Sequence, residues 1–205
     1  KGDHQITSSW TDPDGPEYET ALGITRSNIT FLGKGKGTTT ILGGFCIENQ
    51  QNITFKNMTV TNTSGGGTGM WMSSAKVELF NVALTDCNHA ALLIPDTSFK
   101  TTVVATRCEF ANSSYGAWVE GSLTSATFNN CVFQVNFNDG IVVSNNATIH
   151  LHGVATATLS NIRLGICAFN SGKVVIHLPS NHNTSYNNGR DRETYRGGSI
   201  TNVED

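Results

Sequence analysis

The sequence is poor in charge and contains no long apolar run. Lys, Arg, Asp and Glu make up 14% of the 205 residues, and the formal net charge at pH 7 is −3. Because no basic surplus exists to attract phosphate groups, we expect neither nucleic acid nor a membrane surface as a partner. No stretch approaches the ~20 apolar residues that a membrane-spanning helix needs. Only 4 prolines stand against 21 glycines, and with abundant Thr, Ser and Asn this mixture favours many short strands joined by tight corners.

The cysteines form no recognisable framework. Cys46, Cys87, Cys108, Cys131 and Cys167 lie 41, 21, 23 and 36 residues apart. An odd count without a C-x-x-C pair argues against a compact disulfide or zinc framework. We therefore interpret them as separate buried thiols.

Short apolar segments recur with a fixed internal pattern. In one of them, apolar side chains alternate at Ile53 and Phe55, and after a corner at Asn57 the alternation resumes with Met58 and Val60. Successive side chains of a strand point to opposite faces. The pattern therefore predicts a strand, a corner and a second strand with one common face turned inward.

The same frame returns about every 24 residues. Its first inward position falls on Ile29, Ile53, Val77, Val103, Ala126, Ile149, Val174 and Ile200, and its corner on Asn57, Asn81, Arg107, Asn130 and Gly153. Past the corner, the inward series is Met58, Val82, Cys108, Cys131 and Val154. A further strand repeats in register and begins with a small residue at Gly44, Gly69, Ala91, Gly116, Gly140 and Gly165. A unit that recurs at such a period predicts a solenoid.

The repeat predicts an all-β fold, a single-stranded right-handed parallel β-helix of about seven to eight coils. We expect one domain over residues 1–205, with residues 1–28 as the N-terminal cap and first coil. Residues 180–199 are expected to form a polar loop before a last strand. Neighbouring strands lie ~4.8 Å apart, so eight coils give a rod of roughly 35–40 Å.

The opening segment carries a family resemblance. Residues 19–35, ETALGITRSNITFLGKG, and residues 40–44, TILGG, resemble the first coils of pectin lyase-like β-helix proteins. The chain as a whole is similar to uncharacterised β-helix repeat proteins of marine microalgae and their large viruses. The resemblance implies the fold but leaves the activity open, because the pectin lyase-like superfamily includes lyases, hydrolases, esterases, epimerases, phage tailspikes and adhesins.

The carboxylate sets of those enzymes are missing, and histidines form the densest titratable group. Pectate lyases gather several Asp or Glu around calcium, whereas the outward positions here are mostly Thr, Ser and Asn. His150 and His152 alternate on one predicted strand, and His177 takes the position of His152 one coil later, so we expect three neighbours on the outer surface.

Two interpretations of the three histidines remain open. The trio could bind a metal ion or act as the base in an elimination at a uronate, with Arg107 or Lys173 nearby. The alternative is a set of polar residues on a solvated sheet. Because no carboxylate supports the histidines, we favour the second interpretation and assign no confident catalytic residue, no metal and no cofactor.

In the repeating strand that begins with a small residue, the outward positions carry apolar side chains instead of polar ones. They are Cys46, Trp71, Leu93, Trp118, Val142 and Cys167. We call this column the outward stripe. It could contact a polysaccharide, with Trp71 and Trp118 stacked on sugar rings, or another protein chain. The alternative is a stripe covered by the chain itself, for example by residues 181–196.

Sequons for asparagine-linked glycosylation occur at seven positions. Asn146 and Asn183, which we expect in loops, are the best acceptors among them. Glycosylation would imply secretion, so we expect a location outside the cell or on a cell or virion surface.

Three functions are compatible with these features. We favour a non-catalytic scaffold for surface binding or assembly, in contact with carbohydrate or protein, because the known catalytic sets are missing. One alternative is a polysaccharide lyase or epimerase that uses the histidines. The other is a fragment of a larger adhesin or tailspike.

Overall fold

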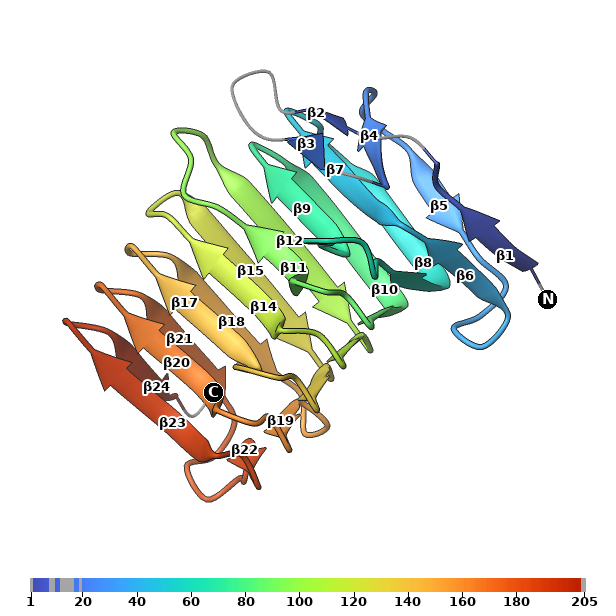
Figure 1. Cartoon of the computed structure of the whole chain (residues 1–205). Helices are drawn as coiled ribbons and strands as arrows, with labels where there is room; N and C mark the ends of the chain where they lie inside the picture. The colour runs from blue at the N-terminus through green and yellow to red at the C-terminus, as the bar shows by residue number, and fades with distance from the viewer. Residues whose placement is uncertain (1, 8–9, 12–16, 19, 204–205) are drawn as a thin grey trace.

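The structure, a computed structural model, describes residues 2–7, 10–11, 17–18 and 20–203. The chain winds as a solenoid whose coils stack from the N-terminal to the C-terminal end (Figure 1). The described strands pair in parallel, apart from the antiparallel pair β2 (Trp10–Thr11) and β3 (Glu17–Tyr18). The prediction of a parallel β-helix is confirmed, with about seven turns.

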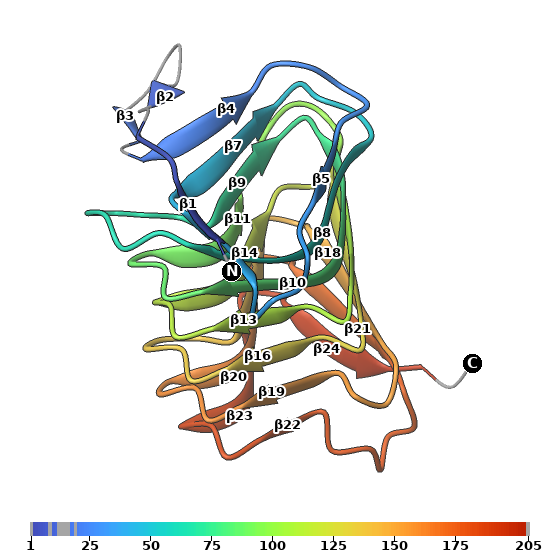
Figure 2. The same cartoon turned by 90° about the vertical axis from the view of Figure 1, so that its right-hand side faces the viewer.

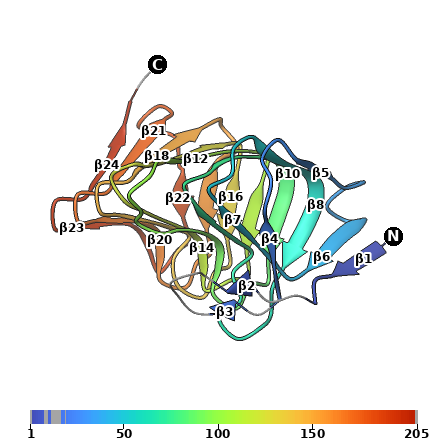
Figure 3. The same cartoon turned by 90° about the horizontal axis from the view of Figure 1, so that it is seen from above.

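Each coil contributes to three faces, which are seen from the side in Figure 2 and from above in Figure 3. The first face holds β5 (Thr30–Leu32), the first halves of β8 (Ile53–Thr61) and β10 (Lys76–Thr85), β12 (Thr101–Thr106), β15 (Thr124–Asn129), β18 (Thr148–His152), β21 (Lys173–His177) and β24 (Ser199–Asn202). The second face holds β1 (Gly2–Gln5), β6 (Thr39–Leu42), the second halves of β8 and β10, β13 (Glu109–Ala111), β16 (Val132–Gln134), β19 (Ala157–Leu159) and β22 (Ser185–Tyr186). The third face holds β4 (Ala21–Ile24), β7 (Gly44–Glu48), β9 (Met70–Ser73), β11 (Ala90–Ile94), β14 (Tyr115–Glu120), β17 (Ile141–Ser144), β20 (Leu164–Phe169) and β23 (Arg190–Tyr195).

The strand register confirms the repeating frame. On the first face Ile53 pairs with Val77 and Val77 with Val103, and the column continues through Ile149 to Val174. The predicted corner residues Asn57, Asn81, Arg107, Asn130 and Gly153 all have positive φ, between 52° and 82°. Left-handed backbone of this kind turns the chain sharply between two strands, which is why Asn and Gly dominate the corner.

The inward side chains form one continuous hydrophobic core along the solenoid. Phenylalanines of neighbouring coils stack within it. The rings of Phe31 and Phe55 lie 4.7 Å apart at 7°, as do those of Phe110 and Phe133. All five cysteines are buried and free, as predicted.

Two predictions about the C-terminal coils are wrong. Val154 does not face inward but is 76% exposed, because the turn after Gly153 takes extra residues and Thr156 occupies the position beside Cys131. Residues 180–199 are not simply a polar loop, since they contain β22 and β23, which pair with β19 and β20. The charges of β23 are compatible with a strand because it is the last strand of its sheet, and charged side chains protect such edges.

A ladder of mostly polar side chains, which we did not predict, builds the corner between the second and third faces, and all of its members are buried except Asn188, which is half-buried. Its members are Asn62, Cys87, Ser113, Asn136, Asn161 and Asn188. The backbone N–H of Asn136 donates to Oδ1 of Asn161 at 3.1 Å, and the N–H of Ser113 donates to Oδ1 of Asn136 at 3.1 Å. Backbone groups that the corner removes from the sheet are thereby paired.

The column of small residues on the third face makes room for this ladder. A Cβ atom at Gly140 would lie 2.7 Å from Nδ2 of Asn161, and one at Gly116 would lie 3.0 Å from Nδ2 of Asn136. Both distances are too short for van der Waals contact. The repeated glycines were therefore the sequence signal for the ladder.

Candidate functional site

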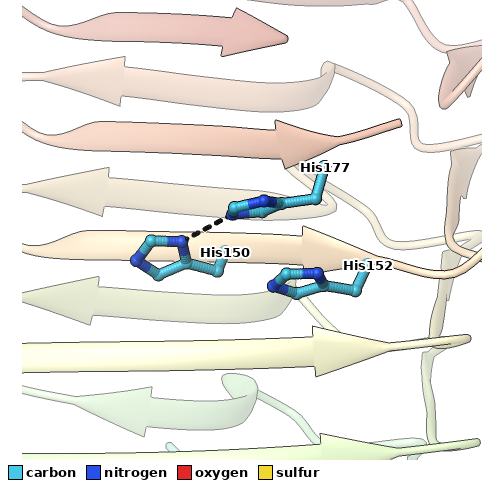
Figure 4. Close-up of side chains that lie close together, drawn as sticks. All are labelled: His150, His152 and His177. Atoms are coloured by element: carbon cyan, nitrogen blue, oxygen red, sulfur yellow. Dashed lines mark hydrogen bonds between the residues drawn. The ribbon is translucent and has the colours of Figure 1, made fainter. Parts of the chain in front are cut away.

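Three histidines gather on the first face, as the sequence predicts (Figure 4). His150 and His152 project from β18, and His177 projects from β21 as the register partner of His152. The rings of His152 and His177 are stacked, with 3.9 Å between centroids and 13° between planes. Nδ1 of His150 lies 2.9 Å from Nε2 of His177. One nitrogen from each ring lies within 4.8 Å of the other two.

The core holds the two strands beneath the histidines in place. Ile149 and Leu151 of β18, and Val174 and Ile176 of β21, are fully buried. Both strands are also paired on each side, β18 with β15 and β21, and β21 with β18 and β24. Alternation along a strand therefore fixes the histidines outward, where all three are half-buried.

The surroundings favour neutral imidazole at His150. Burial lowers the pKa of His150, and His177 lowers this pKa further because two imidazolium charges would repel each other. The 2.9 Å contact between Nδ1 of His150 and Nε2 of His177 needs one donor and one acceptor, so at least one of the two rings is neutral when it forms. A neutral ring nitrogen is the form that binds metal ions.

The two basic residues considered with the histidines, Arg107 and Lys173, lie on different parts of the solenoid. The guanidinium of Arg107 lies over the ring of Phe80, 5.9 Å from its centroid, and lines a hollow of about 350 Å³ to which none of the three histidines contributes. Lys173 is exposed at the start of β21, four residues before His177. An arrangement in which Arg107 assists the histidines is therefore not formed.

No group of carboxylates takes the place of a calcium site in the described part of the chain. There, the three histidines are the one group of at least three His, Cys, Asp or Glu side chains close enough to share an ion. The described residues thus contain no counterpart of the clustered Asp and Glu ligands of pectate lyases.

The outward stripe forms in the predicted register but is largely covered. Consecutive members from Cys46 to Cys167 pair on neighbouring strands from β7 to β20. Trp71 is only 7% exposed and Val142 only 3%, whereas Leu93 and Trp118 are half-buried. Members of the stripe belong to two small hydrophobic clusters outside the core.

Side chains flanking the stripe form these clusters. Ala21 packs with Cys46 and Trp71 near the N-terminal end, and Leu164 packs with Val142 and Cys167 farther along. Residues 181–196, the cover that we considered, instead contribute β23, which extends the third face beside β20. Trp71 and Val142 therefore offer no ring or methyl surface for a sugar to stack on.

The sequence matches a known protein family. The profile of a family described as "Right handed beta helix region" matches residues 24–156, well over half of the chain. The chain belongs to the right-handed β-helix family. Searches of curated proteins and of solved structures found no significant match. Membership of the β-helix family fits both a binding scaffold and an enzyme, so the choice between them depends on the sites.

This β-helix protein has a groove of about 610 Å³ at the C-terminal end of the outward stripe. Its lining consists of Ile162, Arg163, Leu164, Gly189, Arg190, Glu193 and Tyr195. Cys167, the last member of the stripe, is the register partner of Glu193. The groove was not predicted, because four of its seven lining residues, Gly189, Arg190, Glu193 and Tyr195, lie in the segment that we expected to be a polar loop.

A buried carboxylate anchors Arg163 at this groove. Nε and Nη2 of Arg163 donate to the two carboxylate oxygens of Asp139 at 2.9 and 2.6 Å. The hydrogen bonds raise the pKa of the Arg163 guanidinium. The Asp139 side chain is fully buried, whereas that of Arg163 is 57% exposed. The carboxylate therefore holds the guanidinium in place on its buried side, while the rest of the Arg163 side chain is accessible to a ligand. Nearby, the ring of Tyr195 stacks on Phe169 at 5.0 Å and 3°.

The two predicted glycosylation sites, Asn146 and Asn183, are both exposed. Asn146 lies in a turn just before β18. Their glycosylation stays a prediction. Among the described residues no helix has the length and apolar character to cross a bilayer.

Proposed function

We propose that this β-helix protein is a non-catalytic scaffold that binds an acidic carbohydrate in the groove beyond the outward stripe. The observation that carries the proposal is the Arg163 guanidinium, anchored by the buried Asp139 and open toward the groove. A guanidinium fork matches the geometry of a carboxylate, so a fixed one favours a ligand that bears carboxylates.

The apolar groups of the groove suit a sugar ring. Tyr195 and Ile162 are both exposed there, and the stacked Phe169 supports the ring of Tyr195 from below. An aromatic face packs well against the C–H groups of a pyranose. Arg190 adds a second guanidinium, which pairs with Glu193 at 2.8 Å and can exchange that partner for a ligand carboxylate.

The same observations weigh against the alternative functions. A lyase or epimerase needs a base and a cationic partner near one substrate, whereas Arg107 lies over Phe80 and lines a hollow to which none of the histidines contributes. Protein assembly through the outward stripe loses support because Trp71 and Val142 are buried. With an acidic polysaccharide as ligand, the protein would act outside the cell or on a cell or virion surface, where glycosylation at Asn146 and Asn183 would also belong.

A glycan array followed by calorimetry tests the proposal. Oligomers of galacturonate, mannuronate and guluronate are compared with neutral oligosaccharides of the same length. We expect binding of at least one acidic series, weakened about tenfold or more by Tyr195→Ala or Arg190→Ala, which corresponds to about 1.4 kcal/mol.

Phe99→Ala and Lys100→Ala are the matched controls, because both residues are exposed in the β11–β12 loop. Equal affinity for acidic and neutral sugars, or groove variants that bind as the wild type does, would contradict the groove assignment. An ultraviolet-absorbing unsaturated product would contradict the non-catalytic role.

A further inference from the structure

We infer that His150, His152 and His177 form a binding site for one divalent transition-metal ion, separate from the carbohydrate groove and independent of it. The site would supply three imidazole nitrogens from two adjacent strands, β18 and β21. Imidazole is a ligand of Zn²⁺, Cu²⁺ and Ni²⁺, whereas Ca²⁺ and Mg²⁺ prefer oxygen. The donor set therefore selects the metal class.

The distances between the nitrogens are close to those of a chelate. Zn–N bonds of about 2.0–2.1 Å in a tetrahedron place neighbouring donors about 3.3 Å apart. Nδ1 of His150 and Nε2 of His177 are already 2.9 Å apart, and a nitrogen of His152 lies within 4.8 Å of both. Coordination of one ion would require side-chain rotation that shortens the His152 separations by up to about 1.5 Å and turns the three lone pairs toward one point.

The strands prepare the site before any ion arrives. His150 and His152 share one face of β18 because they are two residues apart, and the stacked ring of His177 lies directly across from His152. Both strands are fixed by buried inward side chains and by pairing on each side. Little conformational freedom remains to be lost on binding, which favours affinity.

The electrostatic surroundings of the trio keep its nitrogens available. The side chains that flank it on the same outer face are Thr127 and Asn129 of β15, Val175 and Lys173 of β21, and Thr201 of β24. Among these flanking residues the only charge is the positive charge of Lys173, and none of them offers a carboxylate to pair with an imidazolium.

The three histidines lie on the outer side of the sheet. All three are half-buried and alternate with buried residues, so a fourth position around the ion would face outward, where water can reach it. Three protein ligands with a solvent-accessible fourth position are typical of exchangeable or reactive zinc rather than of closed structural sites.

Calorimetric titration of the whole chain with ZnCl₂, and with CoCl₂ monitored by visible absorption, tests the inference. We expect one Zn²⁺ per chain, visible absorption bands from tetrahedral Co²⁺, and no heat from CaCl₂ or MgCl₂. Binding should weaken as the pH falls from 7.5 to 5.5, because protons compete for the imidazoles.

Three variants separate this site from incidental binding. His152→Gln and His177→Gln should each weaken Zn²⁺ binding at least about 100-fold, beyond the 10–100-fold typical of outer-shell partners. His4→Gln, in β1 at the other end of the solenoid, should bind as the wild type does. The trio side chains lie outside the core, so the variants should fold, as circular dichroism can verify. Unchanged affinity in either trio variant, or no 1:1 binding by the wild type, overturns the assignment.

Discussion

Replacement of Asn136 by alanine should loosen the corner between the second and third faces. Asn136 is fully buried and forms the middle of the polar ladder. Its Oδ1 accepts the N–H of Ser113 at 3.1 Å, and its Nδ2 donates to the carbonyl of Phe110 at 3.2 Å and to Oδ1 of Asn161 at 2.8 Å. Asn136→Ala removes all three hydrogen bonds.

The three losses differ in cost. The N–H of Ser113 becomes a buried donor without a partner, which costs about 1–3 kcal/mol. The Phe110 carbonyl loses one acceptor interaction, worth about 0.5–1.5 kcal/mol. Oδ1 of Asn161 keeps the backbone N–H of Asn136 at 3.1 Å, so its loss is small. The sum is about 1.5–4.5 kcal/mol, a large part of the roughly 5–15 kcal/mol by which domains are stable.

Urea unfolding measures the effect, with hydrogen exchange as a local readout. The exchange of the Ser113 amide should become faster in Asn136→Ala, while amides of β5 at the other end should change least, because a solenoid couples mainly neighbouring coils. The matched control is Asn138→Ala in the same corner, since its side chain forms no hydrogen bond in the described structure and only its backbone N–H donates, to Ser114. The ladder does not hold the corner if the free energies of unfolding of Asn136→Ala and Asn138→Ala differ by less than about 0.5 kcal/mol. The same conclusion follows if the Ser113 amide of Asn136→Ala exchanges as slowly as in the wild type.

Two further predictions concern titratable groups. Burial raises the pKa of the Cys87 thiol to about 11, so iodoacetamide at pH 8 should modify Cys87 only on unfolding. The thiol of the unfolded chain releases its proton near pH 9. The free energy of unfolding should therefore fall by up to about 3 kcal/mol as the pH rises from about 9 to 11. A Cys87→Ser variant that loses just as much stability over this pH range would refute the prediction. In the acidic range, the lowered pKa of His150 means that the unfolded chain binds the proton more readily, so stability should fall as the pH drops from 7 to 5. In thermal unfolding curves, His150→Gln should therefore lose part of this decrease in stability. Another part comes from His89, because burial lowers its pKa as well. If the variant and the wild type have the same pH profile, His150 does not contribute.

The repeating frame could be read from the sequence because each of its features depends on local chemistry. Alternation along a strand fixes whether a side chain faces inward, and a constant coil length places equivalent residues of successive coils side by side. That is why Ile53, Val77 and Val103 form one column, and why the neighbourhood of His152 and His177 was predictable from their positions alone.

The two errors have different causes, a change of coil length at Val154 and the charged sequence of β23. The extra residues after Gly153 push Val154 outward and bring Thr156 inward, and nothing in the alternation near Val154 marks the change. The charged residues of β23 suggested a loop because their sequence lacks an apolar alternation. In the described structure β23 is the last strand of its sheet, a position with which charged side chains are compatible.

The sequence by itself thus determined the coils, their corners and the position of the three histidines. The tertiary structure decided what covers the outward stripe, because the burial of Trp71 and Val142 depends on side chains such as Ala21 and Leu164 that flank the repeating column. It also decided the pairing of Arg163 with Asp139 and the 2.9 Å contact between His150 and His177. Such contacts depend on how side chains from different coils orient in space, which strand periodicity does not specify.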